Sequence, residues 1–254
     1  MLVTRPRRQS AALARPLRAN GAAVIDAPTV RIASLGDWTR VDAALRALRT
    51  YRWLIVTSAN GVSAAVSRMR KLGLDARDLA GLKIAAIGPA TELALRRRFL
   101  RADVVPAEYE ARALSAALRT FKLAGQRCLL LRSDHGGSTL PESLTAAGAI
   151  CHDVVVYRTV RPEALPSFAV RRLRRGDVDW ATFTSSSTFS NFVSLLGTDA
   201  RPILRRLQIA SIGPITSATI RAAGYSPTVE AAEYTAAGLV RAITQLASIR
   251  RASR

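Results

Sequence analysis

The stretch IASIGPITSATI (Ile209–Ile220) repeats a pattern already present in IAAIGPATELAL (Ile84–Leu95). In both, a short apolar run ends at a glycine, a proline follows, and an apolar pattern with helical spacing begins. The β-branched residues of the short run favour a strand. Proline suits the first turn of a helix, because the N–H that it lacks would have no partner there. Each stretch therefore predicts a strand that ends at Gly88 or Gly213 and leads directly into a helix.

The repetition extends along almost the whole chain. The other matching pairs are LVTRP (Leu2–Pro6) with LLLRSD (Leu129–Asp134), LRANGAAVIDAPTVR (Leu17–Arg31) with LTAAGAICHDVVVYR (Leu144–Arg158), WLIVTSANGVSAAV (Trp53–Val66) with WATFTSSSTFSNFV (Trp180–Val193), and EYEARALSAAL (Glu108–Leu118) with EYTAAGLVRAI (Glu233–Ile243). Because the matches keep one order, we interpret the chain as two copies of one α/β unit.

Strands and helices alternate in this pattern, which predicts parallel sheets covered by helices. The polar or proline-containing stretches after Pro28–Ile32 and Val154–Val160 are candidate crossovers between domains. The residues alone leave open whether the two halves are consecutive or interleaved.

Composition bounds the class of protein. A chain of 254 residues, 49% of them hydrophobic, can fill two cores. The net charge of +20 favours an anionic partner, such as nucleic acid, an acidic membrane surface or a polycarboxylate ligand. The start of the chain has no apolar signal region, and no apolar run approaches the roughly 20 residues that span a bilayer. We therefore expect a soluble, intracellular protein whose two cysteines, Cys128 and Cys151, are reduced thiols.

The two Gly-Pro turns are candidate anion sites. Backbone N–H groups near Thr91 and Thr216 would be free donors at the positive end of a helix, where a carboxylate or phosphate can bind. The alternative is a helix start that caps itself, with the threonine as the local partner.

Hydroxyl groups cluster at a second pair of turns, TSAN (Thr57–Asn60) and TSSS (Thr184–Ser187). Such residues cap helices, but they would also lie at the carboxyl ends of parallel strands, where open α/β sheets bind ligands. If the two domains face each other across these edges, a cleft rich in N–H and O–H donors results. The candidate binding residues at these two turns are Thr57, Ser58, Asn60, Thr184, Ser185 and Ser186.

Three more side chains are candidates by position. Tyr157 lies at a proposed crossover, where a phenol could donate a hydrogen bond or a proton, although a tyrosine in an apolar strand is usually core. Arg5 and Arg132 end matched strands and so could face the cleft. The loop Asp134–Gly137 could bind an anion through its backbone or be a plain connection.

Known catalytic and metal-binding patterns are missing. His135 and His152 lack partners at metal-ligand spacing, so we expect no metal site. The sequence contains no P-loop, no GxGxxG and no GxSxG. The other arginine clusters lack the interleaved aromatic residues that stack nucleic-acid bases.

The ordered set of these motifs, from Leu2 to about Leu246, resembles the uroporphyrinogen-III synthases. The resemblance implies a cytoplasmic enzyme without a cofactor, a lyase that converts linear hydroxymethylbilane into uroporphyrinogen III with inversion of the terminal pyrrole ring and loss of water. It implies a monomer with no nucleic-acid or membrane partner and at most a transient contact with the enzyme that makes hydroxymethylbilane.

The resemblance also implies two interleaved, flavodoxin-like domains joined by a two-stranded linker. One domain would hold residues 1–30 and 162–254, the other residues 36–155, with linker strands at about 28–32 and 154–160. Tyr157 matches the family's proposed catalytic tyrosine, and Thr91 and Thr216 match its two Gly-x-x-Thr threonines. The hydroxyl turns match as well, and with Gly88, Gly213, Arg5 and Arg132 they complete the expected substrate-binding set.

One segment departs from the family pattern. Many bacterial relatives have a glycine and then an arginine after LLLR, whereas this chain has SDHGGS (Ser133–Ser138). The departure motivates an alternative function, a non-catalytic relative that binds a tetrapyrrole or another anion. The charge of +20 motivates a further one, a basic protein that binds nucleic acid.

Overall fold

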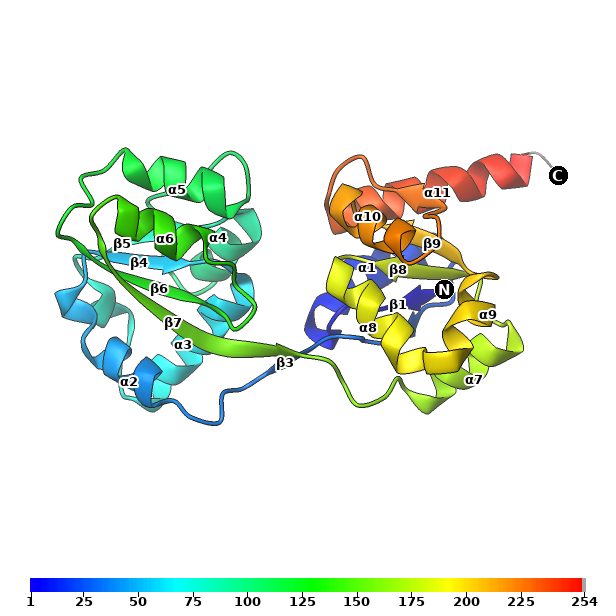
Figure 1. Cartoon of the computed structure of the whole chain (residues 1–254), viewed down its shortest axis with the longest axis horizontal. Coiled ribbons are helices and arrows are strands. Elements are labelled where there is room, and N and C mark those ends of the chain that lie inside the picture. Colours follow the sequence, from blue (N-terminus) through cyan, green and yellow to red (C-terminus); the bar gives the residue numbers. More distant parts are fainter. Residues whose placement is uncertain (253–254) are drawn as a thin grey trace. The chain divides into compact units, whose positions relative to one another are not determined.

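Strands alternate with helices along the whole chain in a computed structural model that describes residues 1–252. The chain forms two units, unit 1 from Met1–Arg31 with Val160–Arg254 and unit 2 from Ile32–Thr159 (Figure 1). Residues 253–254, the end of the first domain expected from the sequence, lie outside the described part. Two parallel-sheet units of α/β type confirm the predicted fold class.

Unit 1 contains one five-stranded sheet. Its strands are β1 (Leu2–Val3), β2 (Ile25–Asp26), β8 (Trp180–Phe183), β9 (Gln208–Ser211) and β10 (Val229–Glu230). They are ordered β10-β9-β8-β1-β2, and every pair is parallel. Counted along the unit, this is the flavodoxin-like order 2-1-3-4-5.

Helices cover both faces of this sheet. They are α1 (Arg7–Ala19), α7 (Ser167–Arg175), α8 (Ser186–Leu196), α9 (Ala200–Leu204), α10 (Pro214–Ala222) and α11 (Ala236–Ala252), with a 3-10 turn at Gly197–Asp199. One core layer lies under α1 and α11 and the other under α7 to α10. In the second layer Phe183 meets Phe189 and Phe192 edge to face, with ring centroids 5.1 and 5.4 Å away.

Unit 2 repeats this plan with its strands supplied in a different chain order. The strands are β3 (Arg31–Ala33), β4 (Trp53–Val56), β5 (Lys83–Ala86), β6 (Arg127–Ser133) and β7 (Ile150–Val160). The sheet order is β3-β7-β6-β4-β5, and a parallel bridge from Ala85 to Val104 extends it beyond β5. Strands β6 and β7 therefore occupy the places that β1 and β2 hold in unit 1, while β4 and β5 match β8 and β9.

The helices of unit 2 again form two layers (Figure 1). They are α2 (Thr39–Arg46), α3 (Ala59–Lys71), α4 (Pro89–Arg96), α5 (Ala111–Arg119) and α6 (Thr139–Ala146), with 3-10 turns at Leu48–Thr50 and Ala76–Leu79. Residues of α2, α3 and α4 pack on one face of the sheet, and those of α5 and α6 pack on the other.

The first crossover strand is shorter than the sequence predicts. Thr29 belongs to unit 1, where its N–H donates to Thr4 O at 3.0 Å and its hydroxyl donates to Thr188 O at 2.9 Å. The strand at this point is therefore Arg31–Ala33 rather than residues 28–32. Its neighbour in the sheet, β7, extends over Ile150–Val160 and so begins earlier than residue 154.

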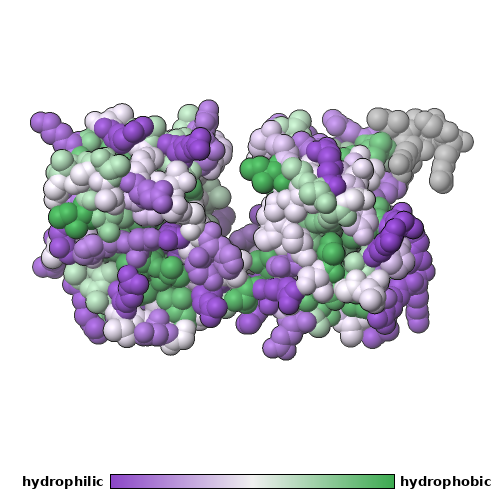
Figure 2. Space-filling model, in the orientation of Figure 1, coloured by the Kyte–Doolittle hydropathy of each residue, from purple (hydrophilic) through white to green (hydrophobic). Residues whose placement is uncertain are grey.

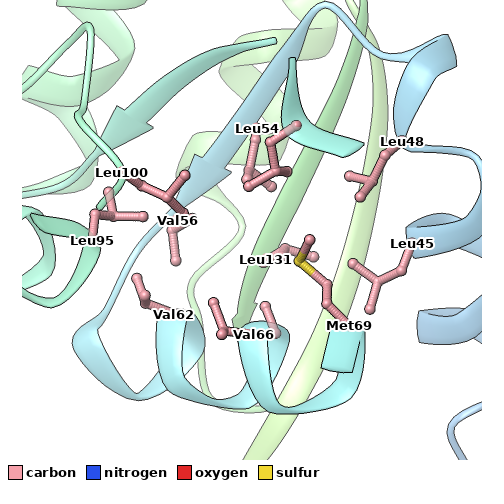
Figure 3. Close-up of a pocket in the computed structure, with 12 residues that line it drawn as sticks. Leu45, Leu48, Leu54, Val56, Val62, Val66, Met69, Leu95, Leu100 and Leu131 are labelled. Atoms are coloured by element: carbon pink, nitrogen blue, oxygen red, sulfur yellow. The ribbon is translucent and has the colours of Figure 1, made fainter. Parts of the chain in front are cut away.

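A small cavity lies inside the core of unit 2. Side chains of α3 (Val62, Val66, Met69) and of the sheet (Leu54, Val56, Leu131) point toward it (Figure 3). At about 20 Å³ and with an apolar lining, it is a packing gap of about one water rather than a binding site for a charged ligand.

Hydrophilic residues are interspersed with neutral and hydrophobic ones on the visible face of each unit (Figure 2). Within residues 1–252, every helix is too short or too polar to span a bilayer.

Candidate functional site

The candidate residues collect at one edge of each sheet. In a doubly wound sheet, ligands bind at the carboxyl ends of the strands, where the strand order reverses. That point lies between β1 and β8 in unit 1 and between β6 and β4 in unit 2. Arg5 and the TSSS turn follow β1 and β8, and Arg132 and the TSAN turn lie at the ends of β6 and β4. Each unit therefore has some of the predicted binding residues at the carboxyl ends of its central strands.

The two Gly-Pro turns begin α4 and α10 without a side-chain cap. Gly88 and Gly213 are the N-cap residues and, as glycines, supply no side chain to the cap. The Gly213 N–H donates to Ser211 Oγ at 3.5 Å, and the Thr91 N–H, expected to be free, donates to Gly88 O at 3.0 Å. Thr91 and Thr216 are only 3% and 4% exposed, so these side chains lie in the protein, while the residues before them, 89–90 and 214–215, are exposed.

A tyrosine ring explains why each turn has a glycine. A Cβ at Gly88 would lie 3.0 Å from Cβ of Tyr109, and a Cβ at Gly213 would lie 2.8 Å from Cδ1 of Tyr234. Both glycines have extended backbone, with φ of 179° and 168°, so the approach of the ring and not the backbone angle requires the missing side chain. The two tyrosines occupy matched positions in the repeat, in EYEA and EYTA.

Tyr157 is held at the same edge of unit 2 by a hydrogen bond and a bulge. Its phenol oxygen lies 3.0 Å from Ser58 Oγ, which also accepts the Gly61 N–H at 2.9 Å and caps α3. The pairing of β6 with β7 shifts between Arg132 and Ser133, so Ser133 faces Tyr157. The structure thus brings Tyr157 and Ser58 together, two residues that the sequence places about a hundred positions apart.

The TSSS turn of unit 1 forms a capping box on α8. Ser185 Oγ accepts the Thr188 N–H, and Thr188 Oγ1 accepts the Ser185 N–H, both at 3.2 Å. Thr188 Oγ1 also accepts the Thr184 N–H at 3.2 Å. Ser186 donates to Ile215 O at 3.3 Å and thereby ties this turn to the Gly-Pro turn. The capping interpretation and the candidate binding edge therefore involve the same residues.

The two matched arginines have different surroundings. Arg132 forms a bidentate ion pair with Asp153, with both N–O distances 2.6 Å, and donates to Gly136 O. Arg5 has no carboxylate partner in the described part of the chain, its Nε is buried without an acceptor, and burial lowers its pKa. Asp26, which matches Asp153, is instead bonded to Ser10 and lies 3.8 Å from Arg18.

The SDHGGS loop closes onto the end of β7. Asp134 Oδ1 accepts the Thr159 N–H and meets His135 Nδ1, both at 2.9 Å, while Oδ2 lies 3.6 Å from Arg158 Nε. The Asp134 N–H donates to Tyr157 O at 3.3 Å. This loop therefore holds the backbone that carries Tyr157. A Cβ at Gly136 would lie 2.7 Å from Arg132 Cδ, so the close approach of the arginine side chain explains why this position of the loop is a glycine.

Sequence reasoning missed the roles of four residues at these edges, although it had considered Asp134 as part of a possible anion-binding loop. Tyr109 and Tyr234 were found as a repeated pair but not placed beside the Gly-Pro turns, and a repeated exposed aromatic residue is the signal that could have found them. Asp134 accepts a hydrogen bond from Thr159 of β7, and Asp153 of β7 pairs with Arg132 of β6. Residue spacing does not reveal such contacts between neighbouring strands. Within the described residues, no group of three or more His, Cys, Asp and Glu side chains could hold a metal ion.

Two doubly wound sheets, each with hydrogen-bond donors at the carboxyl ends of its strands, define a two-domain α/β protein of the flavodoxin-like class. The chain belongs to the uroporphyrinogen-III synthase family, since residues 11–241 match the family described as Uroporphyrinogen-III synthase HemD.

Individual relatives agree with this assignment. The uroporphyrinogen-III synthase of Synechococcus elongatus is 37% identical over 97% of this chain and 95% of its own. That of Chlorobaculum parvum is 27% identical over 88% and 89%. Among solved structures, a mutant uroporphyrinogen III synthase of the extremely thermophilic bacterium Thermus thermophilus matches with a TM-score of 0.65 at 18% identity, covering 97% of this chain and 98% of its own. The Helicobacter pylori protein matches with a TM-score of 0.61 at 17% identity, over 89% and 94%. The two structures share the fold of this chain.

Proposed function

We propose that this protein is a lyase that cyclises hydroxymethylbilane to uroporphyrinogen III, inverting the terminal pyrrole ring and releasing water. The observation that carries the proposal is the 37% identity to the Synechococcus elongatus enzyme over 97% of the chain. The match to the family over residues 11–241 supports it independently. The same findings favour this function over a non-catalytic relative and over a nucleic-acid-binding protein.

The chemical step begins with departure of the substrate hydroxyl as water. We assign Tyr157 the role of general acid in this step, and the Ser58 hydroxyl, 3.0 Å from the phenol oxygen, supports the assignment by orienting it. The resulting azafulvene is electrophilic, and the terminal ring attacks it through a spiro intermediate before the macrocycle closes. What the protein supplies is mainly orientation, which can lower a barrier by roughly 7–11 kcal/mol at its limit.

The substrate carries many carboxylates, and the donors at the two edges suit them. The proposed binding set is Arg5, Thr57, Ser58, Asn60, Gly88, Thr91, Arg132, Thr184, Ser185, Ser186, Gly213 and Thr216. Within the described residues Arg5 has a guanidinium that no carboxylate neutralises, and its Nε still lacks an acceptor. Because Thr91 and Thr216 are buried and Arg132 is paired with Asp153, we assign these three an indirect role, in which they shape the turns and the loop whose backbone binds.

The remaining expectations stand as part of this proposal. The protein would be a cytoplasmic monomer without a cofactor, in transient contact with the enzyme that makes hydroxymethylbilane. Strands β3 and β7, at which the chain passes from one unit to the other, would form the two-stranded linker.

The test is incubation of the protein with freshly made hydroxymethylbilane, followed by chromatographic separation of the type I and type III isomers. The proposal expects type III product. A non-catalytic relative would bind uroporphyrinogen and leave the isomer ratio unchanged, and exclusive type I product would refute the proposal.

A further inference from the structure

Two exposed tyrosines stand at corresponding places in the two units. Tyr109 is 64% exposed and lies between the bridge residue Val104 and α5, and Tyr234 is 66% exposed and lies between β10 and α11. Large aromatic side chains usually bury most of their area. The repetition of the same exposure at matched positions argues against a chance surface residue.

Each tyrosine packs against a glycine. Three atoms of the Tyr109 side chain would lie within 3.3 Å of a Cβ at Gly88, and three atoms of the Tyr234 ring would lie within 3.3 Å of a Cβ at Gly213. The segment before α11 is also packed on its helix, because a Cβ at Gly238 would overlap the backbone oxygen of Glu233. One side of each ring therefore packs on the glycine of the Gly-Pro turn, while most of the side chain remains open to solvent.

The surroundings of each ring indicate what it could bind. The adjoining turn lies at the positive end of a helix, where the Thr91 N–H already donates to Gly88 O in unit 2 and the Gly213 N–H to Ser211 Oγ in unit 1, and other N–H groups of the first turn face the same end. In unit 1 the exposed Ile215 adds apolar surface to the turn on which Tyr234 packs, and Ser186 donates to Ile215 O. An aromatic face next to an anion site fits a flat ring that carries a carboxylate on a short arm.

We propose that Tyr109 and Tyr234 are substrate-contact residues, each placing its ring against a pyrrole whose carboxylate lies at the neighbouring Gly-Pro turn. This inference rests on the proposed function and adds a ring-contact subsite in each unit. The alternative is that the tyrosines only cover the glycines. A covering role needs apolar bulk on the glycine, whereas a contact role needs the aromatic face.

The experiment uses Tyr109→Leu, Tyr109→Phe, Tyr234→Leu and Tyr234→Phe in the full-length protein. Leucine keeps apolar cover on the glycine and removes the ring, and phenylalanine keeps the ring. The control is Phe99→Leu, because Phe99 is 99% exposed and follows the other end of α4. Steady-state rates with hydroxymethylbilane give KM and kcat, calorimetry gives the Kd of uroporphyrinogen III, and thermal melts check folding.

The expected result is a roughly three- to tenfold rise in KM and Kd for each leucine variant, as for a lost aromatic contact, with near-normal values for the phenylalanine variants and the control. Leucine variants that fold and keep the KM and Kd of the unchanged protein would overturn the inference. A lower melting temperature with unchanged KM and Kd would also overturn it, because it would show that the tyrosines only cover the glycines. If the unchanged protein formed no type III isomer, the proposed function would fail by itself, and the Kd values would still decide the role of the tyrosines.

Discussion

The phenol oxygen of Tyr157 lies 3.0 Å from Oγ of Ser58, and the same serine caps α3 through the N–H of Gly61. One hydroxyl thus joins a proposed acid to the start of a helix at the carboxyl ends of the strands of unit 2. Tyr157 also lies on β7, at the bulge in the pairing with β6, and its carbonyl oxygen accepts the Asp134 N–H. The residue is therefore held by the SDHGGS loop through its backbone and by the start of α3 through its phenol.

We expect Tyr157→Phe to lower kcat by at least about a hundredfold with little change in KM, because it removes the proton donor and keeps the ring. The measurement is the initial rate of type III isomer formation. Tyr51→Phe is the matched control, since Tyr51 also has a hydroxyl partner, His152 at 2.8 Å, but precedes β4 and so lies at the opposite edge of the sheet. Unchanged turnover in Tyr157→Phe would remove this residue from the mechanism.

Arg5 and Arg132 should separate binding from stability. Arg5→Ala is expected to raise KM about tenfold, because a guanidinium that no carboxylate of the described chain neutralises is lost. Arg132→Ala is expected to cost about 1–3 kcal/mol of unfolding free energy, because it leaves Asp153 without its ion pair. Urea titrations and steady-state kinetics on both variants check this, and the opposite assignment of the two effects would contradict it.

The Asp134 contacts predict a pH dependence. Burial disfavours the carboxylate, but hydrogen bonds from the Thr159 N–H and His135 and the charge of Arg158 outweigh it and lower the pKa of Asp134. A carboxyl with a folded pKa below its unfolded value of about 3.9 stabilises the fold above that pH, and the contribution is lost as pH falls through the folded pKa.

The Tm difference between the unchanged protein and Asp134→Ala should therefore be largest above about pH 5 and shrink toward about pH 2. Melting curves across this range provide the measurement, and Glu163→Ala, at an exposed loop position, controls for the general loss of a carboxylate. A difference that grows on acidification would show that the sign of the Asp134 contribution is wrong.

The two cysteines should resist alkylation in the native protein. Both are free thiols, and burial raises the pKa of Cys128 to about 11 and that of Cys151 to about 11. Since the thiolate is the nucleophile, iodoacetamide at about pH 8.5 should label the native chain slowly and the guanidinium-unfolded chain at both positions, as read by mass spectrometry. Rapid labelling of Cys128 in native protein would be inconsistent with its burial.

Local patterns in the sequence predicted much of the fold. The Gly-Pro and hydroxyl turns could be placed at strand ends because apolar runs, proline and helical spacing lie next to one another in the chain. Helical spacing also indicates which way the threonines of the Gly-Pro turns face. Thr91 shares a buried face with Ala94 and Leu95, and the corresponding Thr216 shares one with Ile220, so these threonines point toward the core.

Contacts across strands could not be predicted in the same way. Arg5 and Arg132 have matched sequence contexts, yet of the two only Arg132 has a carboxylate partner within residues 1–252. The reason is that Asp26 bonds to Ser10 in unit 1, while its counterpart Asp153 is open to Arg132 in unit 2. Which of two equivalent arginines is neutralised depends on a side chain from another element. The packing of Tyr109 on Gly88 is likewise a contact between distant segments.

The most direct measurement is the isomer composition of the product as a function of protein concentration. Hydroxymethylbilane is prepared freshly, divided among reactions with increasing amounts of the protein, and the oxidised products are separated by chromatography. The account predicts that the type III fraction rises from the spontaneous level toward complete conversion as protein increases, and that Tyr157→Phe shifts this curve to higher concentration. A product that stays type I at every protein concentration would contradict the central claim.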